Sequence, residues 1–233
     1  IVMSTMTIGN IMNDLLDIES DQINHPNRVL ASNRLTVRFA ILIFSFSVFI
    51  LVYFSLQISF KSLFFLYGFI LPLLFSYNIY FKKFPVIGNI IVSLLLGSVF
   101  WFTELALIDS FSILYTPFFL VIIFSFVREI IKDIQDLEGD QDRKTLPTRI
   151  GVSNALNLAV FILLVAISLS YTAINSFENL ARTAYIGGIT LANGIMLLGI
   201  YNSKLEDYFS GQKNIKQGMG VAMLAFILAA GLA

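Results

Sequence analysis

Long apolar segments alternate with short polar ones along the chain. Apolar runs occupy about residues 39–56, 63–81, 86–108, 113–131, 151–173, 183–201 and 218–233, and a shorter one occupies Ile1–Met12. The long runs are close to the roughly 20 residues that an α-helix needs to cross a bilayer. The pattern predicts an all-α, multi-span transmembrane helix bundle that forms a single domain over residues 1–233. The first run is too short to span and the last is barely long enough, so we expect that the chain is cut at its N-terminus and at its C-terminus too.

The amino-acid composition also indicates a membrane protein. The chain has 233 residues, 57% of them hydrophobic and 13% charged, whereas soluble domains are about half apolar and a quarter charged. It has no Cys, which excludes a disulfide framework and a thiol nucleophile. Fifteen basic residues balance fifteen acidic ones, so the chain lacks the excess positive charge that nucleic-acid binding requires.

Basic residues are concentrated in alternate loops. Thirteen of the 15 Lys and Arg lie in or beside the loops near 18–38, 82–85, 132–150 and 202–217, and the other loops hold only Lys61 and Arg182. Cytoplasmic loops of membrane proteins collect Lys and Arg. We therefore predict an integral, multi-pass membrane protein in which these four loops face the cytoplasm.

Acidic residues form a duplicated pattern on the same side. Ten of the 15 Asp and Glu fall in two short stretches that match at a constant offset of 119 residues, so that Asp14 corresponds to Asp133 and Asp17 to Asp136. Each copy follows the end of an apolar run. An isolated D-x-x-D in a loop is usually a solvated surface, but two copies in register on one membrane side indicate a site.

The spacing D-x-x-D-x-x-x-D brings three carboxylates onto one side of a helix, because an α-helix has about 3.6 residues per turn. Carboxylates aligned near a membrane repel one another unless a cation lies against them. Oxygen ligands without His or Cys suit Mg²⁺, which usually shares its coordination with substrate phosphates. Two such faces opposed across a bundle would hold two metal ions with a diphosphate between them.

Other functional classes fit less well. A cation-coupled transporter, the rival from a different class, would have acids near the bilayer midplane rather than at cytoplasmic helix ends. The D-G-x-x-A-R pattern of CDP-alcohol phosphotransferases and the loop pattern of EF-hands are not present in the sequence.

These motifs resemble the two signatures of the UbiA superfamily of intramembrane prenyltransferases. The similar stretches are N-D-x-x-D-x-x-x-D from Asn13 to Asp21 and D-x-x-D-x-x-x-D from Asp133 to Asp140, and the stretches 24–28, 82–89 and 145–151 are similar as well. Within the superfamily, R-E-I-I-K-D-I-Q-D-L-E-G-D at Arg128–Asp140 is most similar to geranylgeranylglycerol-phosphate geranylgeranyltransferases. The resemblance implies a nine-helix fold, of which eight helices are present here and the first is missing.

The resemblance also implies a reaction, Mg²⁺-dependent transfer of a prenyl group from its diphosphate to a membrane-soluble lipid acceptor. A geranylgeranyl donor and geranylgeranylglyceryl phosphate as acceptor are expected, and prenylation of a quinone precursor or a tetrapyrrole remains the alternative. The implied ligands of Mg²⁺ and the diphosphate are Asn13, Asp14, Asp17, Asp21, Asp133, Asp136 and Asp140. Asp14, Asp17, Asp133 and Asp136 are the candidate catalytic residues.

Basic residues near the motifs are candidates for contacts to phosphate. Arg28, Lys82 and Lys144 are the candidates for the diphosphate, with Arg28 first because a guanidinium binds phosphate oxygens in a bidentate way. Lys132 takes the place of Asn13 in the repeat and is a candidate for a phosphate on the acceptor. The positive-inside bias alone also accounts for basic residues at these positions.

Overall fold

The structure is a computed structural model that describes residues 1–24, 26–84, 86–138 and 145–232. Within these ranges every regular element is a helix, which confirms the predicted all-α class. The chain divides into two compact units, which are described separately. Unit 1 comprises Ile1–Lys82 and Phe102–Phe111, and unit 2 comprises Lys83–Trp101 and Ser112–Ala233. The helix α6 (Ile87–Ile108) contributes residues to both units.

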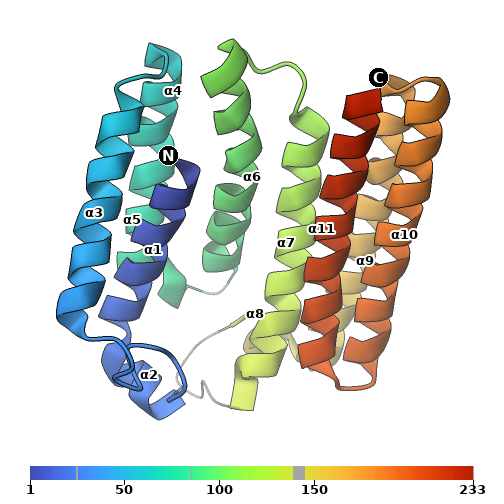
Figure 1. Ribbon diagram of the computed structural model, residues 1–233. Coiled ribbons are helices and arrows are strands. Elements are labelled where there is room, and N and C mark those ends of the chain that lie inside the picture. Colours follow the sequence, from blue (N-terminus) through green and yellow to red (C-terminus); the bar gives the residue numbers. More distant parts are fainter. Residues whose placement is uncertain (25, 85, 139–144, 233) are drawn as a thin grey trace. The chain divides into compact units, whose positions relative to one another are not determined.

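Unit 1 is built around α1, which packs against α3 and α5 (Figure 1). Thr36 caps the N-terminus of α3, where its hydroxyl accepts from the Phe39 N–H at 3.3 Å. Ser59 caps α4 in the same way. The helices of this unit are α1 (Val2–Leu16), α2 (Ile18–Asn24), α3 (Val37–Ser55), α4 (Phe60–Phe65) and α5 (Leu71–Ile79).

The apolar run that predicts one span at 63–81 contains a change of helical pitch. A π-helical turn, Leu66–Ile70, joins α4 to α5, and Pro72 follows it in the first turn of α5. Proline has no N–H to donate and its ring clashes with the carbonyl four residues earlier, which a wider turn relieves. The span therefore stays continuous from Phe60 to Ile79.

Unit 2 has its core along α7. Val127, Ile130 and Ile131 are completely buried there, as is Leu163 of α9. The helices α7, α9, α10 and α11 lie side by side (Figure 1). The remaining helices of this unit are α7 (Tyr115–Gln135), α8 (Leu146–Ile150), α9 (Val152–Ser170), α10 (Asn179–Lys204) and α11 (Tyr208–Leu232), with 3-10 turns at Asp136–Glu138 and Tyr171–Ser176.

The helices α10 and α11 form the most extensive helix pair within the described residues, and glycines allow their close approach. A Cβ built on Gly188 would lie 2.4 Å from the Cβ of Ala225, and one built on Gly211 would lie 2.1 Å from the Ser203 Oγ. Without side chains at these two positions the backbones come close enough to exclude lipid from the pair.

Six helical segments in the described part of the chain are long and apolar enough to cross a membrane: Val37–Ser55, Phe60–Ile79, Ile87–Ile108, Val152–Ser176, Asn179–Lys204 and Tyr208–Leu232. All six correspond to predicted spans. The predicted span 113–131 is the helix α7, which is 21 residues long but carries Arg128, Glu129 and Lys132 toward its end. The run at Ile1–Met12 lies in α1, which has 15 residues.

The predicted start of the last span was wrong by ten residues. The apolar run begins at 218, but α11 begins at Tyr208, so most of the predicted loop 202–217 is helical. Hydropathy marks where lipid contact begins, whereas helical hydrogen bonding continues through polar residues such as Gln212 and Lys213. The loop between α10 and α11 is only Leu205–Asp207.

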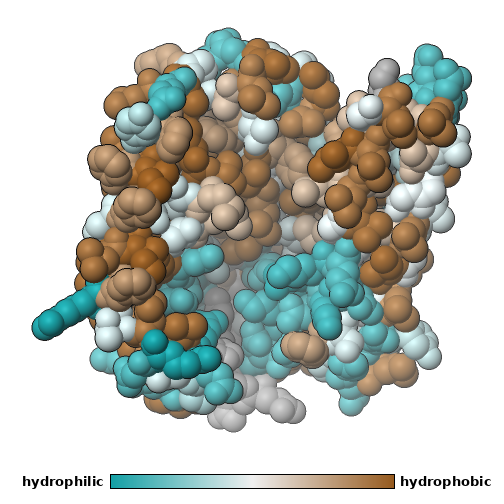
Figure 2. All heavy atoms as spheres, in the orientation of Figure 1, coloured by the Kyte–Doolittle hydropathy of each residue, from teal (hydrophilic) through white to brown (hydrophobic). Residues whose placement is uncertain are grey.

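Large apolar side chains are exposed on the membrane helices, as a lipid-facing surface requires. Phe46 and Phe49 of α3 are 64% and 66% exposed. In unit 1, hydrophobic residues cover α3, and hydrophilic residues gather at the end that carries α2 (Figure 2). The protein is therefore an integral membrane protein whose acidic motif in this unit lies at a polar end.

Candidate active site

The first acidic motif lies where α1 ends. Asn13 and Asp14 are in the last turns of α1, Asp17 is its C-terminal cap, and Asp21 lies in the first turn of α2. The backbone leaves helical geometry at Asp17 (φ −108°, ψ 8°). Acidic side chains are unfavourable at a helix C-terminus because the carbonyls there already carry partial negative charge. The predicted continuous helical face is therefore interrupted at its central carboxylate.

Asp21 is paired with Arg28, which lies seven residues further along the chain. The Arg28 Nη1 donates to both carboxylate oxygens of Asp21, at 2.7 and 2.8 Å. The Asp21 side chain is 7% exposed and that of Arg28 is 40% exposed. Burial acts to lower the pKa of Arg28, but the hydrogen bond and the charge of Asp21 outweigh it, and the net shift is upward. The Arg28 side chain is thus held in its charged form.

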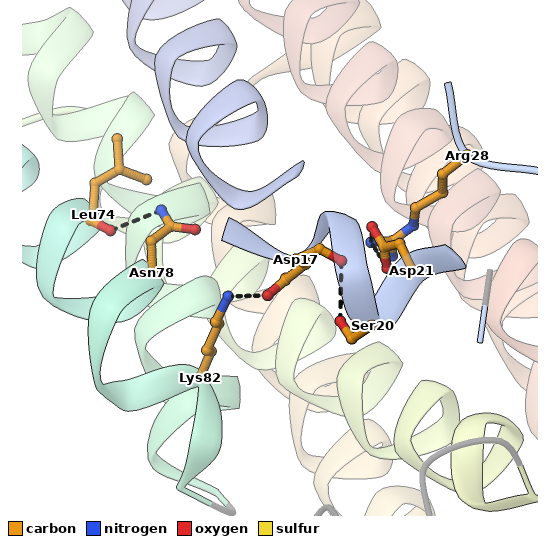
Figure 3. Close-up of polar contacts among 7 residues, drawn as sticks. All are labelled: Asp17, Ser20, Asp21, Arg28, Leu74, Asn78 and Lys82. Carbon is orange, nitrogen blue, oxygen red and sulfur yellow. Dashed lines mark hydrogen bonds and ion pairs between the residues drawn. The ribbon is translucent and has the colours of Figure 1, made fainter. Parts of the chain in front are cut away.

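Asp17 is paired with a cation from a distant part of unit 1. The Lys82 Nζ lies 2.5 Å from the Asp17 Oδ1 (Figure 3). Lys82 lies in the 3-10 turn Phe81–Lys83, directly after α5, and both side chains are largely buried. The structure therefore brings two of the predicted phosphate-binding residues, Arg28 and Lys82, into direct contact with the first acidic motif.

Asp14 shares the electrostatic environment of this motif. Burial raises the pKa of its carboxyl above the ordinary value; the charges of Asp21 and Asp17 raise it further, and that of Arg28 opposes them. Asp14 lies beyond the apolar run Ile1–Met12, at the polar end of α1. Three carboxylates that act on one another in this way concentrate negative potential, which a cation relieves.

The second acidic motif begins in the last turn of α7 and continues into a 3-10 turn. Asp133 is on the helix, and Asp136 is the first residue of the turn Asp136–Glu138. The Nδ2 of Asn89, near the start of α6, donates to the Asp133 Oδ2 at 2.7 Å. The change of pitch at Asp136 means that this motif, like the first, does not lie on one continuous α-helical face.

A polar network holds this end of α7 against α11. Arg128 donates from Nη1 to Glu129 at 2.6 Å and from Nη2 to the Gln212 Oε1 at 3.0 Å. The Gln212 Nε2 in turn donates to the Gln135 Oε1 at 3.0 Å. Gln135 directly precedes Asp136, so one side chain of α11 contacts α7 before and after Asp133 and one residue ahead of Asp136.

The carboxylate and amide oxygens of the first motif are suitable ligands for a divalent cation. Among the described residues, no group of three or more His, Cys, Asp and Glu is already arranged to hold a metal ion. The reason lies in the contacts above, because Asp17 and Asp21 point to Lys82 and Arg28. The donor set of carboxylates and an amide is the one that Mg²⁺ prefers, and the mutual repulsion felt by Asp14 favours such an ion. The residues present therefore fit the metal.

The predicted site residues and those that the structure describes agree only in part. Asp140 and Lys144, both predicted site residues, lie outside the described residues. Lys132 is half-buried on the last turn of α7. Asn89 and Asn78 were not predicted as site residues, although a polar side chain within an apolar run is a signal of function in membranes.

Comparison with known proteins identifies the fold and the family. The UbiA prenyltransferase family matches residues 1–232. A digeranylgeranylglyceryl phosphate synthase of Methanothrix thermoacetophila is 37% identical over 94% of this chain and 80% of its own length. A solved structure described as giving insights into digeranylgeranylglyceryl phosphate synthase in membranes is 28% identical, with a TM-score of 0.69 over 97% of this chain and 82% of that one.

A further solved structure shows the fold alone. It is a UbiA homologue from Archaeoglobus fulgidus bound to DMAPP and Mg²⁺, 15% identical, with a TM-score of 0.62 over 96% of this chain and 84% of that one. The family match and the relative that is 37% identical confirm the predicted family resemblance, and with it the predicted enzyme class. This chain belongs to the UbiA prenyltransferase family.

Proposed function

We propose that this prenyltransferase moves a geranylgeranyl group from its diphosphate to geranylgeranylglyceryl phosphate and that the reaction depends on Mg²⁺. The observation that carries the proposal is the first acidic motif, where Arg28 and Lys82 contact Asp21 and Asp17 directly. Anion-binding and cation-binding side chains thus share one place at the polar end of unit 1. The acceptor is proposed because the relative that is 37% identical carries the name of that activity.

The acidic residues would hold the metal. In the first motif these are Asn13, Asp14, Asp17 and Asp21, and in the second Asp133, Asp136 and Asp140. Mg²⁺, when bound, supplies positive charge that stabilises the departing diphosphate. A UbiA homologue that binds both DMAPP and Mg²⁺ supports this assignment.

The basic residues would bind phosphate. Arg28 and Lys82 now neutralise Asp21 and Asp17, and a metal ion on those carboxylates would free both cations for diphosphate oxygens. Lys144 is the third candidate. Lys132, which lies on the last turn of α7 beside Asp133, would contact the phosphate of the acceptor.

The proposed reaction exchanges one carbon–oxygen bond for another. The bond between C1 of the prenyl group and the diphosphate breaks, and its electron pair leaves with the diphosphate. The acceptor hydroxyl oxygen forms the new bond to C1, and its proton passes to the released diphosphate or to solvent. Positive side chains near the leaving group lower the barrier because they stabilise the charge that develops there.

We also propose that the active site faces the cytoplasm. The loops that carry Arg28 and Lys82 belong to the set that holds 13 of the 15 basic residues, and such loops stay on the cytoplasmic side. Labelling of single cysteines introduced beside Arg28 and Lys61 with an impermeant reagent in intact cells tests this orientation. The cysteine near Lys61 is expected to react and the one near Arg28 is not; the reverse pattern would contradict the orientation.

Membranes that contain the whole protein allow the reaction to be tested directly. They are given geranylgeranyl diphosphate with geranylgeranylglyceryl phosphate, a quinone precursor or a tetrapyrrole, with Mg²⁺ or with EDTA, and the products are identified by mass. We expect the ether lipid, formed only with Mg²⁺. Prenylation of an aromatic ring instead of the lipid would refute the acceptor, and full activity in EDTA would refute the metal.

Substitutions test the assigned residues in the same assay. Asp17→Ala and Asp136→Ala should each abolish transfer, because each removes an oxygen ligand at the centre of a motif. The matched control is Glu19→Ala, which removes an exposed carboxylate two residues from Asp17 and should retain activity. Full activity in either Asp variant would disprove the metal assignment.

A further inference from the structure

Asn78 is a buried polar residue that the proposed function does not use. It lies near the end of α5 and is only 2% exposed. Its Nδ2 donates to the Leu74 carbonyl at 3.0 Å, and its Oδ1 is buried without a hydrogen-bond partner among the described residues. The bond to Leu74 sets the orientation of the amide, because only the NH₂ group can donate to a carbonyl. The oxygen must therefore point away from Leu74.

The first acidic motif lies on the side to which this oxygen points. Asn78 lies in the last turn of α5, and Lys82 lies in the 3-10 turn that follows this helix. In Figure 3 the amide oxygen of Asn78 points to the side where the Lys82 ammonium meets Asp17. A buried oxygen that lacks a donor thus points to the side of the ammonium group of Lys82, which carries three donors.

We propose that Asn78 is a positioning residue that holds the Lys82 ammonium at the site when a metal ion has taken Asp17. This inference rests on the proposed function. Mg²⁺ and an ammonium compete for the same carboxylate, so Lys82 must release Asp17 when the metal binds. The Asn78 Oδ1 accepts one of its N–H groups, and the other N–H groups of Lys82 then point to oxygens of the diphosphate.

This role explains why a membrane helix keeps an unpaired amide oxygen. Burial of a polar atom without a partner is unfavourable, and most asparagines of this kind satisfy both ends of the amide. In the proposed complex with metal and substrate, the Lys82 ammonium provides the missing hydrogen bond to the Asn78 Oδ1. Without Asn78 the released ammonium would be free to turn away from the diphosphate.

The variant Asn78→Ser tests the role of the amide oxygen apart from that of the amide NH₂ group. A serine hydroxyl on a helix commonly donates to the carbonyl four residues earlier, as Ser93 does to Asn89 at 2.7 Å. The variant therefore keeps a bond to Leu74 but loses the amide oxygen, because the one oxygen of the shorter serine side chain is the atom that bonds to Leu74. We expect the KM for geranylgeranyl diphosphate to rise about tenfold, while the KM for the acceptor stays within about twofold.

A double-mutant cycle with Lys82→Ala distinguishes positioning from a structural effect. If Asn78 acts through Lys82, the double variant should be no worse in donor KM than Lys82→Ala alone. Independent structural damage would instead multiply the two effects. Additive losses in the cycle, or an unchanged donor KM in Asn78→Ser, would overturn the inference.

Asn193→Ser is the matched control. Asn193 of α10 is 3% exposed, its Nδ2 donates to the Ser170 Oγ, and its Oδ1 has no partner among the described residues. It belongs to unit 2, and its amide bonds to a serine of α9 rather than to a residue of the first acidic motif. It should lower thermal stability without a change in donor KM. If Asn78→Ser does not fold, Asn78→Leu takes its place in the cycle.

Direct binding keeps the inference separate from the proposed function. The dissociation constant of geranylgeranyl diphosphate with Mg²⁺ is measured for wild type and Asn78→Ser. Donor binding by wild type without transfer to any offered acceptor would refute the proposed acceptor but not the role of Asn78. Equal donor affinity in the two proteins would refute the role of Asn78 alone, and no binding by wild type would refute both.

Discussion

The close approach of α10 and α11 makes Gly211→Ala a sensitive test of the packing in unit 2. The new Cβ would lie 2.1 Å from the Ser203 Oγ and 3.0 Å from the Gly199 carbonyl oxygen. Ser203 is completely buried, and its hydroxyl donates to the same carbonyl at 2.9 Å. The backbone oxygen cannot rotate away, so the two helices must separate.

Two opposing effects set the size of the loss. Overpacking of a buried contact costs about 1–3 kcal/mol, whereas Ala in place of Gly within a helix contributes about 0.8–1 kcal/mol of stability. The net destabilisation is therefore about 0–2 kcal/mol, which corresponds to a Tm lower by up to about 8 °C in a protein of this size.

Thermal unfolding of the purified protein in detergent measures this effect. Gly220→Ala is the matched control, because Gly220 also lies in α11 but has no atom within 4 Å of its added Cβ, and its Tm should be unchanged or higher. Ser203→Ala removes the nearest atom and should restore part of the loss in the double variant. A Tm for Gly211→Ala equal to that of Gly220→Ala would refute the close approach.

Three further substitutions test other contacts. Arg28→Gln leaves Asp21 without its cation and should raise the donor KM about tenfold or more, whereas the exposed Arg34→Gln should leave the donor KM unchanged; equal values in both variants would contradict the role of Arg28. Gly151→Ala forces a side chain onto a residue with φ +82° and should cost about 1–3 kcal/mol, seen as a lower Tm; an unchanged Tm would show that this turn relaxes. Asp109→Asn breaks an ion pair with Lys61 in which the side chains of both residues are about half exposed or more. It should leave the Tm unchanged, because exposed ion pairs contribute little to stability; a clear drop in Tm would contradict this.

Local sequence information was sufficient for the spans and for the acidic motifs. Lipid contact requires a run of apolar residues of nearly constant length, so the segment Phe60–Ile79 was recognisable even though it contains a π-helical turn and a proline. The duplicated D-x-x-D-x-x-x-D was recognisable because its spacing does not depend on the rest of the fold. Family membership followed from the same motif residues.

Helix ends were less predictable than helix positions. The helix α1 stops at the first motif, and α11 starts ten residues before its apolar run. A helix end depends on capping, on charge near the helix dipole and on neighbours that satisfy its free backbone groups. Hydropathy reports none of these, and it therefore misplaced the loop 202–217.

The sequence by itself determined that this protein is an all-helical membrane enzyme with two acidic motifs, because hydrophobic length and motif spacing are local properties. Only the tertiary structure decided the partners of Asp17 and Asp133. Lys82 reaches Asp17 from 65 residues away, and Asn89 reaches Asp133 from 44 residues away. It likewise decided that the amide oxygen of Asn78 lacks a donor. Such pairings depend on how helices pack, which the order of residues along one helix does not specify.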